Sequence, residues 1–145
     1  MADLTRVDFH TNVPDKLVYA CRLARKAYMA GNKIVVLAGN DTQLDFLNAA
    51  MWTISPTDFV PHVLASDPLA AQSPIVLTDS EEVELPHHDI LINLSQLPPA
   101  SYAQFRRVFE IVSTDEQDAQ AGRQRFQHYR KLNVQPTHFV AGNKA

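Results

Sequence analysis

Three stretches rich in aliphatic residues predict strands, and the near-continuous run at residues 33–38 predicts a strand that is covered on both faces of its sheet. They span residues 33–38, 74–78 and 89–94, and the last is the clearest central strand. Near-continuous aliphatic runs are typical of parallel sheets, because helices cover both of their faces. Weaker patterns predict the remaining strands, at residues 6–10 and 107–112, at a short strand end within 59–64 and at an edge strand within 134–140.

A helical pattern follows the first predicted strand. Its apolar positions recur every three or four residues and form one stripe: Leu17, Ala20, Cys21, Ala24, Ala27 and Tyr28. Asp15 precedes this stripe and is the predicted N-cap, and Gly31 follows it as a stop signal. The stripe predicts a helix that packs against the sheet.

Two more helices are predicted at residues 42–52 and 115–132, with a short helical turn at 102–105. Ser113 or Thr114 is the expected cap of the long final helix, because a hydroxyl can accept a hydrogen bond from a free helical N–H group. Strands and helices alternating at this spacing predict right-handed βαβ units. We therefore expect the 145 residues to form a single α/β domain with three layers, a mostly parallel central sheet flanked by helices.

Glycines are few and scattered: Gly31, Gly39, Gly122 and Gly142. Nucleotide-binding fingerprints need clustered glycines, since backbone N–H groups must approach phosphates closely. The expected fold is thus Rossmann-like without a nucleotide-binding loop, and no cofactor is expected. Residues 39–42 could hold an anion where a strand meets a helix N-terminus. Asp41 brings a negative charge to that place, so capping of the helix by Asp41 is the favoured interpretation.

Charge is distributed unevenly along a chain whose formal net charge is −3. Residues 1–40 carry six basic and three acidic side chains, residues 41–100 carry nine acids and no Lys or Arg, and residues 101–145 carry seven basic and four acidic side chains. The net charge excludes a nucleic-acid binder that works by bulk positive charge. The pattern suggests a polarised surface with a small basic region, unless the charges segregate in sequence and mix in space.

Side chains for catalysis or metal binding are sparse. Cys21 is the single cysteine and lies on the apolar stripe, where it acts as a small core residue. No two histidines are spaced four apart on a predicted helix, and the adjacent His87 and His88 would point in opposite directions on an extended segment. We therefore expect no metal site and no catalytic site. A small enzyme or nucleotide-binding protein on the same frame is the alternative.

The chain shows no sign of export or membrane insertion. Its first residues lack the basic region and apolar run of a signal peptide, and no run approaches the ~18 apolar residues of a membrane span. A lone thiol agrees with a reducing compartment. We expect a cytoplasmic protein that contacts no membrane.

Two aromatic residues indicate recognition of another protein. Trp52, the only tryptophan, lies where the second predicted helix ends, and Phe59 follows seven residues later beside prolines. Large aromatic side chains near irregular backbone are common interface anchors. The competing interpretation is that Trp52 covers the core.

The final predicted helix offers a second recognition surface. At about 100° per residue, Arg123, Phe126 and Arg130 fall on one side of it. Tyr129 and Leu132 lie further round, together with Ala121, and can face the core. An aromatic ring between two guanidinium groups suits a carboxylate beside an apolar side chain, as at a peptide C-terminus. The alternative is an ordinary solvated helix face.

Four features occur in a fixed order along nearly the whole chain. They are Trp52, the run Asp58-Phe59-Val60-Pro61-His62, the strand at residues 89–94, and a late helix with Arg123-Gln124-Arg125-Phe126 followed by Tyr129-Arg130. In these features the chain resembles the chi subunit family of the bacterial DNA polymerase III holoenzyme. The spacing from Trp52 to the Phe-Val-Pro-His run is the most specific of them.

The resemblance implies a nucleotide-binding-like α/β fold that binds no nucleotide and catalyses nothing. It also implies two protein partners: the psi subunit, which links chi to the clamp loader, and the acidic C-terminal tail of single-stranded-DNA-binding protein. In some bacteria a helicase-like protein competes for the psi surface. No direct contact with nucleic acid is implied.

Site residues follow from the same resemblance, position by position. Those that match the psi-binding surface are Trp52, Phe59, Pro61 and His62. Those that match the tail-binding site are Arg123, which is expected to pair with the terminal carboxylate, and Val112, Phe126 and Gln127, with Arg130 as a further cation on the same side.

Three positions depart from the family pattern at the tail site. The family has a tyrosine at the place of Phe126 and lysines at the places of Gln127 and Ala119. One hydroxyl and two cations are therefore lost, whereas the aromatic packing surface is kept. Attraction to an acidic tail is expected to be weaker than in the family, with Arg130 compensating in part.

Overall fold

The computed structural model describes residues 5–53, 60–82 and 85–141, and within them the chain forms one seven-stranded sheet. Its elements are β1 (Arg6–Val13), α1 (Lys16–Met29), β2 (Ile34–Leu37), α2 (Asp41–Ala50), β3 (Val63–Leu64), β4 (Ile75–Thr78), β5 (Ile90–Asn93), β6 (Arg107–Ser113), α3 (Glu116–Lys131) and β7 (Thr137–Val140), with short 3₁₀ turns at Ala70–Gln72 and Tyr102–Gln104. Every predicted strand and helix is therefore present, with bounds shifted by a few residues at most elements.

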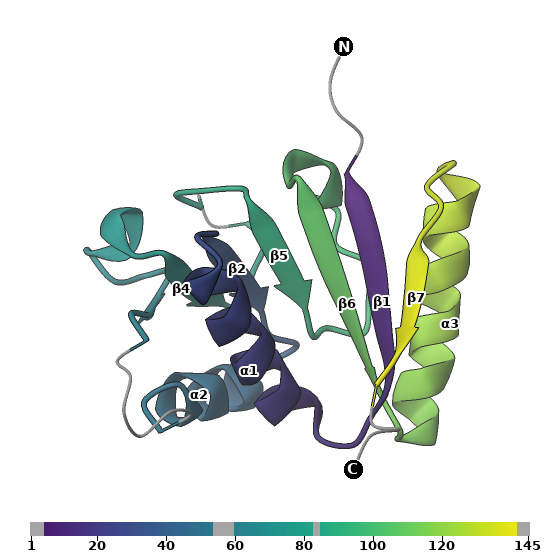
Figure 1. The fold of residues 1–145 in the computed structure, drawn as a ribbon, viewed down its shortest axis with the longest axis horizontal. Coiled ribbons are helices and arrows are strands. Elements are labelled where there is room, and N and C mark those ends of the chain that lie inside the picture. The colour runs from purple at the N-terminus through teal and green to yellow at the C-terminus, as the bar shows by residue number, and fades with distance from the viewer. Residues whose placement is uncertain (1–4, 54–59, 83–84, 142–145) are drawn as a thin grey trace.

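The sheet is parallel throughout, with strand order β3-β4-β2-β5-β6-β1-β7. Its central strands β2, β4 and β5 are buried at every position, which confirms the coverage on both faces that the aliphatic run at residues 33–38 predicts for β2. The strand expected near the C-terminus is β7, and it lies at one edge of the sheet. Figure 1 shows β1, β6 and β7 side by side, so the first and last strands of the chain are neighbours in this half of the sheet.

Helices cover both faces of the sheet, which confirms the three-layer α/β class. Buried residues of α1 and α2 pack with one face of the strands, and α3 packs on the other face. In Figure 1, α1 and α2 lie together over the β2 and β4 side, and α3 lies beside β7 and β1. The half of α3 that does not face the sheet is open to solvent.

Two helix caps differ from the sequence-based expectation. The carboxylate of Asp15 accepts a hydrogen bond from Val18 N, as expected. In α2, Asn40 rather than Asp41 is the cap, because its side-chain oxygen accepts from Gln43 N at 2.8 Å. In α3, the cap is Asp115, which accepts from Asp118 N at 3.0 Å, rather than Ser113 or Thr114. Asp41 instead lies in the first turn of α2, where a carboxylate favours the helix dipole.

The buried stripe of α3 consists mostly of polar residues: Asp118, Gly122, Arg125 and Tyr129. Tyr129 faces the core as predicted, but Leu132 is 45% exposed, so its predicted core position is wrong. Gly122 brings the helix close to β6, because a Cβ placed there would lie 2.7 Å from a methyl carbon of Val112. α3 therefore packs closely on β6, and its exposed face points away from the sheet.

Candidate functional site

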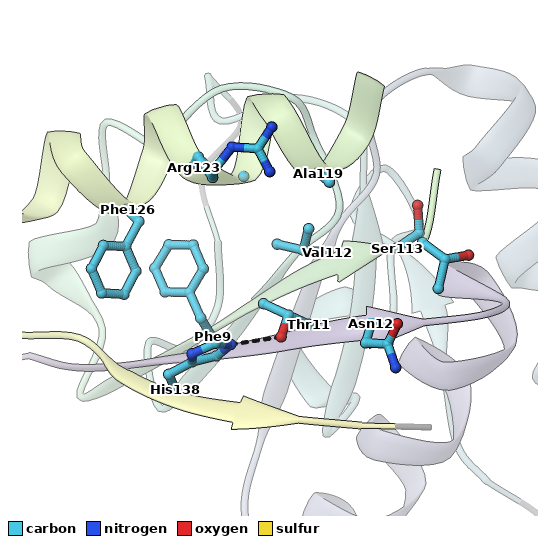
Figure 2. Close-up of a pocket in the computed structure, with 11 residues that line it drawn as sticks. Phe9, Thr11, Asn12, Val112, Ser113, Ala119, Arg123, Phe126 and His138 are labelled. Atoms are coloured by element: carbon cyan, nitrogen blue, oxygen red, sulfur yellow. Dashed lines mark hydrogen bonds between the residues drawn. The ribbon is translucent and has the colours of Figure 1, made fainter. Parts of the chain in front are cut away.

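A groove of about 470 Å³ opens between α3 and the carboxyl ends of β1 and β6. The residues that line it come from four parts of the chain: Phe9, Thr11, Asn12, Val112, Ser113, Thr114, Ala119, Gly122, Arg123, Phe126 and His138. Figure 2 shows Arg123 at the α3 side, the rings of Phe9 and Phe126 side by side, and His138 at the opposite wall. We call this space the Arg123 groove.

The floor of the Arg123 groove is apolar and aromatic. The rings of Phe9 and Phe126 meet edge to face, with centroids 5.1 Å apart. Phe9 is buried, whereas Phe126 is half-buried, so part of its ring faces the groove. On the far wall the His138 Nε2 and the Thr11 hydroxyl lie 2.6 Å apart and are hydrogen-bonded. Such a floor can receive an apolar side chain.

Arg123 supplies positive charge at the rim. It is exposed, and among the described residues it has no ion-pair partner. A guanidinium group that is not engaged within its own chain can bind an incoming carboxylate through two parallel hydrogen bonds. The groove therefore combines one accessible cation with an apolar floor, the chemistry that suits a carboxylate next to an apolar side chain.

A buried polar cluster fixes α3 in the position that forms this rim. Arg125 Nε donates to Glu110 Oε1 at 2.8 Å, and both side chains are fully buried. Tyr129 donates its hydroxyl to Glu110 Oε2 at 2.7 Å, and Asn93 Nδ2 donates to both carboxylate oxygens. Burial raises the pKa of Glu110, while the Arg125 guanidinium and the other donors oppose that shift. Arg125 points into the protein. Arg123 lies two residues earlier on the same helix, so it points to the opposite side and is exposed.

Asp118 anchors the first turn of α3 to three other segments. Its carboxylate accepts hydrogen bonds from Lys16 Nζ at 2.8 Å, Gln96 Nε2 at 2.7 Å and Ser113 N at 2.7 Å. Partial burial acts to raise the pKa of Asp118, but these donors, Lys16 first, outweigh it and lower the pKa from 3.8 to about 2. The ionised carboxylate is therefore the form that stabilises the fold.

Replacing Asp118 with Asn should lower the free energy of unfolding near neutral pH. It should also make the free energy of unfolding less dependent on pH in the acid range. The folded-state pKa lies below the unfolded value, so the stabilisation is complete above about pH 4 and is lost as the pH falls towards about 2. Urea unfolding across this range tests the expectation. Wild type and Asp118→Asn should converge as the pH falls, and curves that stay parallel down to pH 2 would contradict this role.

The second candidate surface surrounds Trp52, at the end of α2. Trp52 is 59% exposed, which contradicts the competing interpretation that it covers the core. Its ring packs against His62 with centroids 4.7 Å apart. His62 is itself buried, with Nδ1 2.8 Å from the Val60 carbonyl oxygen and Nε2 3.2 Å from that of Asn48. His62 thus supports Trp52 from below, and Pro61 beside it is half-buried. Phe59 lies outside the described residues.

The structure brings together only some of the residues that were predicted to bind the acidic tail. Val112, Arg123 and Phe126 line the Arg123 groove, and Gln127 lies with Arg123 in an adjoining polar hollow on α3. Arg130 is exposed and lines neither of these spaces. Sequence reasoning missed the opposite wall, formed by Phe9, Thr11, Asn12 and His138, because β1 and β7 are neighbours only in the folded sheet.

Two further candidate sites are a recess at one edge of the sheet and the thiol of Cys21. A recess of about 290 Å³ lies at the carboxyl ends of β2 and β5, but Asp79 and Glu81 line it, which disfavours a phosphate. The Gly39 N–H at its edge donates to Gln43 Oε1 at 2.7 Å. Cys21 is buried, and burial raises the pKa of its thiol to about 12.

Two features are absent from the described part of the chain. No group of three or more His, Cys, Asp or Glu side chains could hold a metal ion. No helix in the described ranges combines the length and apolar character needed to cross a bilayer.

The fold and the two surfaces define a three-layer α/β protein whose exposed features are suited to holding other proteins. The family model described as DNA polymerase III chi subunit, HolC, matches residues 4–137. The chain therefore belongs to the DNA polymerase III chi subunit family, as the sequence resemblance predicts, and is an accessory subunit of that replicative polymerase.

Curated relatives agree with this assignment. DNA polymerase III subunit chi of Pseudomonas aeruginosa is 34% identical over 133 residues, which cover 88% of this chain and 91% of the relative. The Haemophilus influenzae subunit chi is 27% identical, with 77% of each chain covered. The Escherichia coli subunit chi is 24% identical, with 76% of this chain and 75% of the relative covered.

Proposed function

We propose that this protein is a non-catalytic bridge in lagging-strand DNA replication. One end holds the psi subunit of the clamp-loader assembly through the Trp52 surface. The other end holds the acidic C-terminal tail of single-stranded-DNA-binding protein in the Arg123 groove. The two surfaces lie on different helices, α2 and α3, on opposite faces of the sheet, so both partners could be bound together.

The Arg123 groove is the observation that carries the proposal. An acidic tail presents a terminal carboxylate and neighbouring apolar side chains. Arg123 offers an accessible guanidinium that no described side chain engages, and Phe9 and Phe126 offer an aromatic floor directly below it. Charge-assisted pairing orients the carboxylate, and burial of the apolar side chain adds affinity.

The departures from the family pattern affect long-range attraction more than contact. Ala119 lines the groove and Gln127 lies beside Arg123, so each substitution removes a cation from the immediate surroundings. Phe126 keeps the ring that packs on Phe9. Binding should therefore remain salt-sensitive, because the rim is exposed, with fewer charges contributing than in the family pattern.

Binding of psi is assigned to the Trp52 surface, which consists of Trp52, Pro61 and His62 with Phe59 beside them in sequence. An exposed tryptophan that is held in place by a buried partner, His62, is the arrangement expected of an interface anchor. Phe59 and Pro61 follow in sequence at the spacing that the family uses. A helicase-like protein that competes with psi would use the same surface.

Trp52→Ala and Phe59→Ala should each abolish co-purification of psi while leaving the thermal unfolding transition nearly unchanged. Aromatic anchors of this kind contribute about 2 kcal/mol or more to binding. Leu69→Ala is the matched control, because Leu69 is also an exposed apolar residue but does not belong to the Trp52 surface. If Phe59→Ala unfolds the protein, Phe59 belongs to the core. If psi is retained by both variants at wild-type levels, the surface is wrongly assigned.

The rival function is a small enzyme on the same frame, acting in the cytoplasm as the bridge would. Such an enzyme needs convergent polar groups in a deep cavity at the carboxyl ends of the strands. The recess at the carboxyl ends of β2 and β5 measures only about 290 Å³, and its Glu81 carboxylate is engaged by Ser101 N and the Ser101 hydroxyl at 2.9 and 2.7 Å. These features favour the bridging role.

A further inference from the structure

A second groove, of about 520 Å³, lies on the other face of the sheet, between α1 and β7. Its lining residues are His10, Tyr19, Arg22, Leu23, Lys26, Phe139, Val140 and Ala141. Successive residues of a strand point to opposite faces, so His138 lines the Arg123 groove while Phe139 lines this one. The edge strand β7 therefore separates two grooves. We call the second one the Arg22 groove.

The floor of the Arg22 groove is an exposed apolar surface on an edge strand. Phe139 is 50% exposed, and the half-buried Leu23 of α1 extends the surface. Proteins usually protect edge strands with charged side chains. β7 carries none between Thr137 and Val140, and among the described strands it pairs with β1 alone. A peptide can therefore approach both the floor and the backbone edge.

The rim of the Arg22 groove is positive. Arg22 and Lys26 are exposed, lie one helical turn apart on α1, and have no ion-pair partner among the described residues. Asp8, whose carboxylate acts on the lining residue His10, is buried and already bound by Arg107 Nε at 2.7 Å. It is also bound by Arg6 and the Thr137 hydroxyl, so it does not neutralise the rim.

The back wall adds no competing charge. His10 Nδ1 and the Tyr19 hydroxyl are hydrogen-bonded at 2.5 Å, and the His10 ring packs against Phe139 with centroids 5.3 Å apart. Burial lowers the pKa of His10, with Arg107 and Lys26 acting in the same direction and Asp8 opposing them. The neutral ring serves as a rigid support for Phe139.

We propose that the Arg22 groove is a second, weaker binding site for an acidic peptide that carries an apolar side chain. Carboxylates of the peptide pair with Arg22 and Lys26, and its apolar side chain lies on Phe139 and Leu23. The Arg22 groove repeats the chemistry of the Arg123 groove, an accessible guanidinium above an aromatic floor, and charge complementarity selects an acidic occupant. The choice of ligand rests on the proposed function, because the replication tail is such a peptide.

The test uses the full chain, labelled for NMR, and a synthetic peptide of the acidic tail of single-stranded-DNA-binding protein. At saturating peptide, resonances of Leu23, Phe139 and Val140 should shift in a second phase, after those of Val112 and Phe126. In Arg123→Ala the second phase should persist. In the double variant Arg22→Ala with Lys26→Ala the apparent affinity of the second phase should fall roughly tenfold, as expected when two charge-assisted contacts are lost.

Lys33→Ala combined with Arg130→Ala is the matched control, since it removes the same charges away from both grooves. Shifts around Phe126 without a second phase would overturn this inference and leave the proposed function standing. Absence of shifts at both grooves would contradict the proposed function itself. Equal loss of the second phase in the control would show that net charge alone attracts the peptide. A dimer that Phe139→Lys dissociates would assign the groove to a second copy of the chain.

Discussion

Arg123→Ala should weaken binding of the acidic tail peptide about 10- to 150-fold, or ~1.5–3 kcal/mol, as expected for loss of a charge-assisted hydrogen-bonded partner. The structure gives the reason for so large an effect. Arg123 has no ion-pair partner among the described residues, so its full hydrogen-bonding capacity is available to the ligand. Phe9 and Phe126 lie beside it and hold the apolar neighbour of the carboxylate.

Fluorescence titration of a labelled tail peptide measures this effect, with Arg130→Ala as the matched control. Arg130 is exposed on the same helix and lines neither groove, so its removal should change affinity only slightly. Amidation of the peptide C-terminus should reproduce most of the loss in wild type and cause little further loss in Arg123→Ala. Unchanged affinity of Arg123→Ala would show that the carboxylate binds elsewhere.

Arg125→Ala should destabilise the protein by about 3–5 kcal/mol, although it lies only two residues from Arg123. Arg125 and Glu110 form a fully buried ion pair at 2.8 Å, and removing the guanidinium leaves a buried carboxylate without its countercharge. Tyr129 and Asn93 would still donate to Glu110 but carry no charge. The loss also removes one of the contacts that hold α3 on β6, so the Arg123 groove should be perturbed as well.

Urea unfolding followed by circular dichroism gives the free energies. The double variant Glu110→Gln with Arg125→Met should recover much of the lost stability, because no uncompensated charge then stays buried. Arg123→Ala provides the exposed comparison and should change the free energy of unfolding by less than about 0.5 kcal/mol. If Arg125→Ala were as mild as Arg123→Ala, the buried pair would not be what holds α3.

The core of the fold was predictable because its central strands are mostly aliphatic. β2, β4 and β5 are buried at every position, and short β-branched and aliphatic runs of this kind between helices favour strands of a parallel sheet. The inner face of α3 was not predictable in the same way. Its buried stripe includes Asp118 and Arg125, which pair with polar groups from β6 and from the loops. Apolar periodicity cannot detect such a stripe, and Glu110 within a buried strand was its only sequence signal.

The residues of the candidate sites also differ in whether the sequence alone could predict them. Arg123 and Phe126 could be placed together from helical geometry, since they lie on one helix. Phe9 and His138 complete the same groove but come from opposite ends of the chain. They meet because β1 lies next to both β6 and β7, and strand order is a property of the whole sheet. The helix face thus predicts only half of the groove.

Capture of psi on immobilised tail peptide tests the central claim most directly. The tail peptide is fixed to a surface, psi is passed over it, and this protein is added or omitted. The bridging account predicts that psi is retained only when the protein is present, and that either Arg123→Ala or Trp52→Ala abolishes retention. If psi fails to accumulate while the protein is bound to the tail, or accumulates equally without it, the protein is not a bridge.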